Sequence, residues 1–428
     1  MASTYLTRTF GAETNRKIWT WSAWVKRQNL VSDHQNALFA VYENTSNRSV
    51  FRFSAHQLNF QDTGNSVEIK TNRLFRDTSA WYHIVARVDT TQATASDRVR
   101  IYVNGEQETS FATATYPNQN ADMMFNNSFI HFINARQDGS IDSIADMSYS
   151  HIHFADGQSY APTVFGSTDA TTGEWSIKAS PSVTYGNNGF FILKDGNSVT
   201  DQSGNSNNWT VASGTLTKTE DNPSNVFATL NPLVPDAGST GFFHGNNQFN
   251  VNTANWRSAF STLGMSSGKF YFESQIQAGG YIHLGARGVE QSDGSLTGNN
   301  DWIGVTSQGW SYDKTGEVKN NNSTVASGKA TYSNTDIIGC LLDLDNWTIN
   351  WTKNGTLINS TAYNITQNLT YVFGVSGHST ARILTNFGNG NFSSTAIASA
   401  GTNASNNGIF EYDVPTGFTA LSTKGLNL

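Results

Sequence analysis

Cysteine is nearly absent from this sequence. Among its 428 residues there is one, Cys340, and it lies inside the apolar run 337–342. A single cysteine excludes an intrachain disulfide framework and a cysteine-based zinc site. Because a free cysteine in an apolar run behaves as a small hydrophobic side chain, we expect Cys340 to be buried in a strand.

Charge is also scarce. Charged residues make up 14% of the chain and leave a formal net charge of −7, whereas ordinary soluble domains contain about 25% charged residues. Without a basic stripe we expect no nucleic-acid binding. No apolar run approaches the roughly 20 residues of a membrane span, and residues 1–5 lack the basic and apolar regions of a secretory signal. We therefore expect a soluble chain made in a cytoplasm, without membrane insertion.

Glycine, with 37 residues, and aromatic side chains, at 12%, are abundant instead. Many turn formers together with many aromatic residues favour strands over helices, so the predicted fold class is all-β. The length favours two or three domains over a single core. Helical spacing is clearest at 255–263, and we expect a short helix there, with one face formed by Trp256, Ala259, Phe260 and Leu263.

The stretch 341–358 has the pattern of a β-hairpin. Trp347, Ile349 and Trp351 alternate with small polar residues, which places three large apolar side chains on one face of a strand. Asn354 and Gly355 tolerate the positive φ angles of a tight turn. We therefore expect both tryptophans to be core residues rather than a binding surface.

This hairpin resembles the central hairpin of the SPRY domain, a β-sandwich used for recognition in many unrelated proteins. Further motifs follow that family's order, namely Gly-Lys-Phe-Tyr-Phe-Glu at 268–273, His-Leu-Gly-Ala-Arg at 283–287, Trp-Ile-Gly-Val at 302–305, Tyr-Val-Phe-Gly-Val-Ser at 371–376 and Asn-Phe-Gly at 386–388. The resemblance covers about residues 241–428. It implies a SPRY-like β-sandwich in this part of the chain.

SPRY domains bind through loops at one end of the sandwich, and the resemblance implies a set of candidate ligand contacts. They are Arg287, Trp302, Trp310, Tyr312 and His378. Aromatic rings stack on the apolar faces of sugars, while amide and carboxylate side chains bind the hydroxyl groups. For Trp302 and Trp310 the alternative is packing in the core or at its rim.

Residues 1–165 contain a second series of short alternating strands. Three motifs in order, Trp-Val-Lys at 24–26, Trp-Tyr-His-Ile-Val at 81–85 and Ile-Tyr-Val-Asn-Gly at 101–105, resemble the laminin G-like and concanavalin A-like lectin/glucanase fold. That resemblance implies another β-sandwich. We expect Trp19, Trp21 and Trp81 to be structural residues of this sandwich, since strands with many aromatic residues bury one face.

Residues 166–240 contain more Phe, Trp and Leu than flexible linkers do, so we expect an ordered, mostly irregular connector. The predicted order is a laminin G-like domain (1–165), the connector and a SPRY-like domain (241–428), that is, two jelly-roll-like sandwiches in series. This combination resembles structural or appendage proteins of bacteriophages. The resemblance implies a location in the virion after assembly in the host cytoplasm, with capsid or tail proteins as partners, and we expect a homo-oligomer.

Motifs for catalysis are missing. Retaining glycosidases need two carboxyl groups about 5 to 5.5 Å apart, and glucanases that resemble the first fold carry them in a Glu-x-Asp-x-Glu or Glu-x-Asp-x-x-Glu strand, which this sequence lacks. Glu106 and Glu108 have no partner aspartate, and Asp343 with Asp345 fits hydrogen bonding in a turn. We therefore expect a protein that is not an enzyme.

Metal-ligand patterns are weak. His151 and His153 would share one face of a regular strand, with Asp156 nearby. Asp142 and Asp146 could hold Ca²⁺ at the rim of a lectin-like fold, although turn and capping roles are commoner. We predict no metal site and no cofactor, and a rim Ca²⁺ stays an open alternative.

These observations favour a non-enzymatic bacteriophage virion surface protein. Its role would be recognition or adhesion, with a host-surface glycan or protein bound by a short tail or capsid appendage, because the chain has no repeat that could form a long fibre stalk. Two alternatives stay open. One is a capsid decoration protein that binds and stabilises the shell, and the other is a glycan-degrading enzyme.

Overall fold

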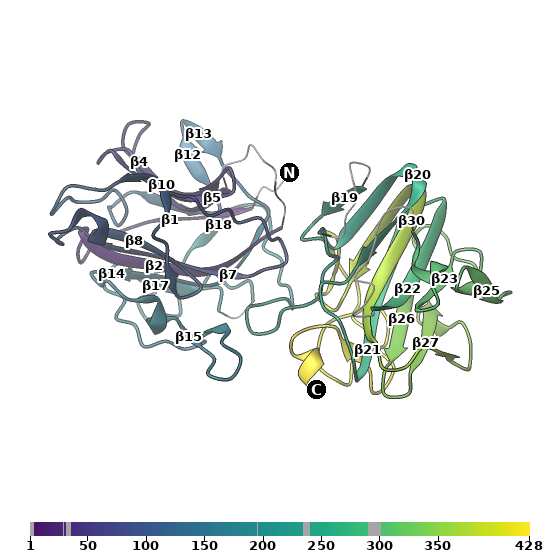
Figure 1. The fold of residues 1–428 in the computed structure, drawn as a ribbon. Coiled ribbons are helices and arrows are strands. Elements are labelled where there is room, and N and C mark those ends of the chain that lie inside the picture. The colour runs from purple at the N-terminus through teal and green to yellow at the C-terminus, as the bar shows by residue number, and fades with distance from the viewer. Residues whose placement is uncertain (1–3, 29, 31–35, 195, 234–239, 290–300) are drawn as a thin grey trace. The chain divides into compact units, whose positions relative to one another are not determined.

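The computed structural model describes the whole chain except residues 1–3, 29, 31–35, 195, 234–239 and 290–300. The described residues form two compact units, 1–218 and 219–428 (Figure 1). Both are built from strands, and the helices among the described residues are short 3-10 turns. The all-β fold class predicted from the sequence is confirmed. Within the described part, no helix has the length and apolar composition of a membrane span.

Unit 1 contains two large antiparallel sheets. The larger sheet runs from edge to edge through β10 (Phe111–Thr115), β6 (Val67–Thr71), β5 (Gln57–Asp62), β4 (Arg48–Ser54), β3 (Asn36–Tyr42), β11 (Ile130–Ile133), β1 (Tyr5–Thr9) and β18 (Thr210–Ser213). The smaller sheet runs through β17 (Phe190–Ile192), β14 (Met147–Asp156), β2 (Ile18–Arg27), β7 (Tyr82–Asp89), β8 (Val99–Val103) and β9 (Glu106–Gln107). The remaining elements are the hairpins β12 (Arg136–Asp138) with β13 (Ser140–Asp142) and β15 (Gly166–Thr168) with β16 (Trp175–Ile177), and the turns η1 (Ala95–Asp97) and η2 (Pro162–Val164).

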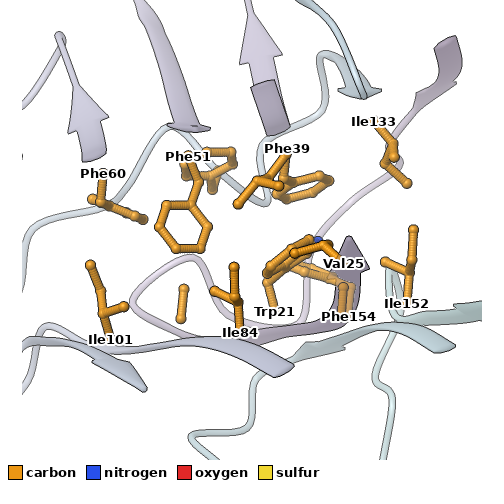
Figure 2. Close-up of a cluster of buried hydrophobic side chains, with 14 of the residues drawn as sticks. Trp21, Val25, Phe39, Phe51, Phe60, Ile84, Ile101, Ile133, Ile152 and Phe154 are labelled. Atoms are coloured by element: carbon orange, nitrogen blue, oxygen red, sulfur yellow. The ribbon is translucent and has the colours of Figure 1, made fainter. Parts of the chain in front are cut away.

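The core of unit 1 lies between the two sheets and is rich in aromatic rings. On β2, Trp21 and Val25 point toward rings from the opposite sheet, and Figure 2 shows Trp21 beside Phe39 and Phe51. The ring centroids of Trp21 and Phe51 are 5.6 Å apart in an edge-on arrangement, which is a favourable geometry for aromatic pairs. Trp19, Trp21 and Trp81 are all buried, as expected from the sequence.

The expected connector does not form one separate segment. Its first part belongs to unit 1, where Phe190, Ile192 and Trp209 are part of the same core as β2. Strand β18 extends the larger sheet by pairing with β1. The boundary between the compact units lies at Lys218 and Thr219, well after the predicted end of the first domain at residue 165.

Unit 2 is organised around one extended network of strands, which are antiparallel except for the parallel pair of β33 with β21. Its main path runs through β25 (Ser323–Ala326), β24 (Val318–Asn320), β23 (Gly309–Asp313), β22 (Tyr281–Val289), β30 (Thr370–Asn386), β21 (Lys269–Ala278), β26 (Ile337–Asp343), β27 (Thr348–Lys353) and β28 (Thr356–Leu357). Four strands join this path from the side: β19 (Thr240–Phe243), β20 (Gln248–Phe260), β29 (Tyr363–Asn364) and β33 (Thr419–Ala420). The short pair β31 (Asn391–Phe392) with β32 (Thr395–Ala396), and the turns η3 (Ile303–Val305) and η4 (Gly425–Asn427), complete the unit.

The longest strand, β30, connects the two halves of this network. Its first half pairs with β22 and its second half with β21, while β20 follows it along the other side (Figure 1). The backbone of Ser379, between the two halves, has a φ of +63°. A positive φ in a residue other than glycine interrupts a regular strand. On the side away from β20, β30 therefore pairs with β22 before this interruption and with β21 after it.

The predicted hairpin at 341–358 is present as β26 and β27. Ile349 and Trp351 point into the core, and the indole N–H of Trp351 donates a hydrogen bond of 2.9 Å to the carbonyl oxygen of Leu284. Trp347 differs from the prediction, because it lies in the turn with a φ of +54° and is only half-buried against the core. Cys340 on β26 is fully buried, as expected.

The short helix predicted at 255–263 is wrong, since these residues continue strand β20 and the turn after it. Two features produce the helical spacing of apolar residues. Ala259 faces the core, whereas Phe260 is buried on the opposite side against Ile303, so the strand is apolar on both faces. A bulge before them adds unpaired residues, among them Trp256, to the strand. Tertiary context has overridden the local pattern.

Candidate functional site

Strand β20 contains a large bulge opposite the bend of β30. Residues 254–256 of β20 face only one residue of β30, His378. The regular pairs on the two sides are Thr253 with Ser379 and Arg257 with Gly377. A bulge bends its strand and redirects side chains away from the ladder. In this case it places the ring of Trp256 beside that of His378.

Five rings gather around this bulge, and we call them the aromatic cluster: Trp256, Tyr281, His283, Trp302 and His378. Trp256 is the central ring. Its centroid lies 6.3 Å from that of Tyr281, 4.8 Å from His283, 6.1 Å from Trp302 and 5.3 Å from His378. Tyr281 and His378 also meet directly, at 5.7 Å, because β22 and β30 pair at these two residues.

The cluster is open on one side and closed on the other. The Tyr281 side chain is 57% exposed, and Trp256, Trp302 and His378 are half-buried. His283 is buried beneath them and its Nδ1 atom lies 3.0 Å from the hydroxyl of Ser311. Soluble proteins bury most of their large aromatic side chains. A group of partly exposed rings on a rigid strand base is therefore a candidate binding surface.

The segment 301–305, which carries Trp302, is fixed to the sheet by hydrogen bonds. The hydroxyl of Ser258 donates to the carbonyl oxygen of Asp301 at 2.7 Å. The backbone N–H of Ile303 donates to the hydroxyl of Ser376 at 3.1 Å. These serines are neighbours on β20 and β30, so the same two strands that carry the bulge also position Trp302.

Glycine allows this segment to approach the sheet closely. A Cβ atom at Gly374 of β30 would lie 3.0 Å from the Cδ1 atom of Ile303. A Cβ atom at Gly304 would lie 2.7 Å from the Ser311 hydroxyl oxygen. Contacts this short require atoms to move. The glycines therefore keep η3, and with it Trp302, against β22, β23 and β30.

Charge at the base of the cluster is neutralised within the protein. The guanidinium of Arg287 contacts the Asp301 carboxylate at 2.7 Å, and both side chains are largely buried. Arg287 also donates to the carbonyl oxygen of Trp302 at 2.8 Å. Burial lowers the pKa of His283 to about 3, so its imidazole is neutral at physiological pH. The base of the cluster presents rings without net charge.

Three of the five residues predicted as contacts meet in this place. Trp302 and His378 belong to the cluster, and Arg287 holds the segment that carries Trp302. The structure does not bring the other two to the cluster. Tyr312 is buried, with its hydroxyl donating to the carbonyl oxygen of Ala330. Trp310 packs beside Tyr363, with ring centroids 6.1 Å apart.

Trp256 and Tyr281 were missed by reasoning from the sequence. Trp256 was assigned to the apolar face of a helix that does not exist, and its position depends on the bulge in β20. Tyr281 follows Gly279 and Gly280, and this turn between β21 and β22 was a usable signal. A tyrosine directly after two glycines starts a strand at its exposed end.

Unit 1 contains a serine and a histidine in contact, which could suggest a nucleophile and its base. The Ser22 hydroxyl lies 2.9 Å from Nε2 of His83. The indole N–H of Trp175 lies 3.0 Å from Nδ1 of the same ring, and an indole N–H can only donate. Nδ1 therefore accepts, so in the neutral ring the proton is on Nε2 and Ser22 is the acceptor.

This arrangement is opposite to the one that activates a serine, since a general base must accept the hydroxyl proton. Ser22 and His83 are also buried, and burial lowers the pKa of His83 to about 3. The Trp175 ring covers this site. It packs closely against Gly105 and Gly166, because a Cβ atom at either glycine would lie 2.6 Å from the Trp175 ring. The contact stabilises the outer face of the smaller sheet.

The carboxylates considered for hydrolysis have structural surroundings. Glu108 forms an ion pair of 2.9 Å with Arg73, and Glu106 is exposed on the short strand β9. Asp343 accepts hydrogen bonds from the backbone N–H groups of Asp345 and Asn346, at 3.1 and 2.9 Å. The predicted turn role of Asp343 is confirmed.

The histidines considered as metal ligands are separated by an irregularity. β14 changes register between Ser150 and His153, and His151 has a φ of +50°. His153 is buried, with Nδ1 2.9 Å from the Tyr185 hydroxyl. Asp142 pairs with Arg136 at 2.7 Å. Among the described residues there is no group of three His, Cys, Asp or Glu side chains that could hold a metal ion.

Comparisons with known families agree with the two units. Residues 2–150 match the model of the concanavalin A-like lectin/glucanases superfamily, and residues 269–390 match that of the SPRY domain. The chain thus carries a concanavalin A-like domain followed by a SPRY domain. Each match covers less than half of the chain.

Curated relatives are similar over a limited part of the chain. A probable ATP-dependent RNA helicase, ddx1, of Dictyostelium discoideum is 32% identical over 103 residues, which are 24% of this chain and 12% of the helicase. The helicase Ddx1 of Drosophila melanogaster is 34% identical over 101 residues, or 23% of this chain and 13% of the helicase. The chain therefore spans about an eighth of these relatives.

Solved structures similar to part of the chain include SPRY domains. The SPRY domain of human HERC1 is 15% identical, with a TM-score of 0.29, and the match covers 36% of this chain and 96% of that domain. The TRIM65 PSpry domain is 14% identical, with a TM-score of 0.30, and the match covers 37% of this chain and 88% of that domain.

Proposed function

We propose that this chain is a non-catalytic recognition protein of a bacteriophage virion, and that the aromatic cluster of its SPRY domain binds a host-surface glycan. The observation that carries this proposal is the bulge in β20, which presents Trp256 next to the exposed ring of Tyr281. Sugar rings have apolar faces that stack on such side chains. The match of residues 2–150 to a lectin-containing superfamily supports the same class of ligand.

Placement in a virion rests on the order of the two domains, which resembles that of phage appendage proteins. A lectin-type domain next to a SPRY domain is suited to attachment, because both folds serve recognition. The reversed proton arrangement at Ser22 and His83, together with the turn role of Asp343, favours binding over hydrolysis. Short appendage and capsid decoration are then distinguished by location on the particle.

The binding test uses the full-length chain on a printed array of bacterial surface polysaccharides. We expect Trp256→Ala to lower binding at least about tenfold, because an aromatic platform at the centre of a site contributes 2 kcal/mol or more in many interfaces. The thermal unfolding temperature should change little, since Trp256 lies in the bulge and is only half-buried.

Leu357→Ala is a control for this test. Leu357 is 50% exposed and lies on β28 of the same unit, outside the aromatic cluster and away from β20 and β30. Its replacement should leave glycan binding unchanged. Equal losses for the two variants, or binding only to a purified host protein and to no polysaccharide, would refute the glycan assignment.

Location is tested with gold-labelled antibody against this chain on intact particles. Label at the tail or at short appendages supports the attachment role. Label spread over the head supports the decoration role instead. Particles that carry no label would refute the virion assignment, whatever the array shows.

A further inference from the structure

Polar side chains continue from the aromatic cluster along β20 and β30. Beyond the bulge, Asn252 pairs with Thr380, and Asn250 pairs with Arg382. Asn252, Thr380 and Arg382 are exposed, and Asn250 is half-buried. The residues between them are core residues, namely Phe249, Val251, Ala381 and Ile383. Since side chains alternate along a strand, the polar residues lie together on the outer side of the β20–β30 ribbon.

This row has the chemistry that saccharides require beside a stacking platform. Amide side chains donate and accept hydrogen bonds at the same time, which matches hydroxyl groups that do both. The amide of Gln248 continues the row, because it donates to the side-chain oxygen of Asn250 at 3.1 Å. The Asn250 amide oxygen is thus oriented by its neighbour, and that leaves its amide nitrogen available as a donor.

Arg382 is the charged group at the far end of this row. The other arginines of unit 2, Arg257 and Arg287, are buried, whereas Arg382 is exposed. Among the described residues no carboxylate pairs with Arg382, although the chain as a whole is acidic, with a net charge of −7. A guanidinium presents a planar fork of donors that fits a carboxylate with two parallel hydrogen bonds.

The length of the row distinguishes a single sugar from a chain of sugars. His378 and Arg382 are four positions apart on β30, which corresponds to at most roughly 13 Å at about 3.3 Å per residue, since the positive φ of Ser379 interrupts the strand between them. One sugar stacked on Trp256 and Tyr281 does not reach that far. A ligand that contacts both ends must therefore be an oligosaccharide that follows the ribbon.

We propose that the ligand of the aromatic cluster is an acidic oligosaccharide, which stacks one sugar on Trp256 and Tyr281 and places the carboxylate of another sugar against Arg382. This inference rests on the proposed function, because it specifies the ligand class of the same site. The amides of Asn250 and Asn252 bind hydroxyl groups between the two ends. Neutral glycans share the stacking contact and lack the ion pair.

The experiment compares two probes with the same sugar ring and linkages, namely polygalacturonate and the same polymer after reduction of its carboxylates to uncharged hydroxymethyl groups. Affinity of the full-length chain is measured for both by calorimetry at low ionic strength. We expect polygalacturonate to bind about tenfold more tightly, since a charge-assisted hydrogen-bond pair contributes about 1.4 kcal/mol or more. Added salt should reduce that preference, because the ion pair is exposed.

Arg382→Ala should lower the affinity for polygalacturonate to that for the reduced polymer and leave the reduced polymer unaffected. Arg382→Lys keeps the charge without the planar fork, so an intermediate affinity is expected. Arg76→Ala is the matched control, because it removes an exposed arginine of unit 1 and changes the net charge equally. Circular dichroism confirms that each variant is folded.

The outcomes separate this inference from the proposed function. If both polymers bind equally and Trp256→Ala abolishes binding, the acidic ligand is refuted and glycan recognition stands. An equal effect of Arg382→Ala and Arg76→Ala also refutes the acidic ligand, because general charge would then explain the preference. If neither polymer binds, the acidic ligand is refuted, and the proposed function is judged on the polysaccharide array alone.

Discussion

Glu273 illustrates at the scale of one residue how burial changes a titration. Its carboxylate lies inside unit 2 and accepts hydrogen bonds from the backbone N–H groups of Glu411 and Tyr412, both at 2.9 Å, and from the Tyr271 hydroxyl at 3.0 Å. Burial raises the pKa of Glu273 to about 7, although these donors oppose the rise. The charged carboxylate ties the C-terminal segment to β21, at the cost of desolvation.

The first prediction concerns the pH dependence of stability. Because the Glu273 pKa is higher in the folded chain than the usual 4.5 of the unfolded chain, its favourable contribution is complete below pH 4.5 and disappears as the pH rises through 7. The shift corresponds to about 3 kcal/mol. In urea unfolding between pH 4.5 and 7.5, the free energy of unfolding of the wild type relative to that of Glu273→Gln should decline by about this amount as the pH rises.

Buried histidines change the stability with pH in the opposite direction. Their contribution is the same in variant and wild type, so it drops out of the difference between the two. Burial lowers the pKa of His83 and of His131 to about 3, so both oppose folding when the pH falls below their usual 6.5. These histidines are unchanged in Glu273→Gln. An unaltered pH profile in that variant would contradict the account of Glu273.

At the scale of elements, the turn between β27 and β28 shows what the sequence could and could not predict. Asn354 and Gly355 have φ values of +46° and +78°, as expected from an Asn-Gly turn between alternating strands. The contact that the turn makes with Tyr412 was not predictable. A Cβ atom at Gly355 would lie 2.7 Å from the Tyr412 ring. Tyr412 belongs to a segment far from Gly355 in the sequence, so no local pattern predicts this contact.

The second prediction uses this turn. Gly328 provides a matched comparison, because its φ is +67° and a Cβ atom there would meet nothing within 4 Å. Gly328→Ala should lower the free energy of unfolding by about 1 kcal/mol, from the backbone conformation alone. Gly355→Ala should cost roughly 2 to 3 kcal/mol, since Tyr412 must also move. Equal costs in urea titrations would show that Tyr412 adapts freely.

The candidate site was predictable only in part, for a physical reason. Trp302 lies in a motif that identifies the fold and His378 follows another such motif by two residues, so family resemblance was enough to find them. The orientation of the Trp256 ring depends on the bulge in β20, and that bulge depends on how β20 pairs with β30. Local sequence patterns record alternation along one strand, and they contain no information about the register with a strand more than a hundred residues away.

At the scale of the whole molecule, the core defines the domains better than motifs do. The motifs of the first domain end near residue 165, but Phe190, Ile192 and Trp209 complete its core. In unit 2, Ala228 and Leu230 lie in the core before the first predicted strand of that domain. The motifs located the strands of each domain, whereas the core also includes residues outside the stretches that carry the motifs.

A third prediction follows for fragments of the chain. Residues 1–218 should fold cooperatively alone, with dispersed amide signals in NMR spectra and a single thermal transition. Residues 1–165 should be unfolded or aggregated, because removal of three buried aromatic or aliphatic side chains costs about 2 to 5 kcal/mol each, which is comparable to the total stability of a domain. A well-folded 1–165 fragment would show that the later segment is dispensable.

The bulge in β20 also has an evolutionary consequence. Residues 254–256 carry no regular ladder pairing with β30, and Ala254 and Asn255 are exposed. We therefore expect substitutions at these positions to change the surface of the aromatic cluster without a change in strand register or in the core. A protein built in this way can acquire a new ligand preference through a few mutations, while the selection that maintains its fold acts on other residues.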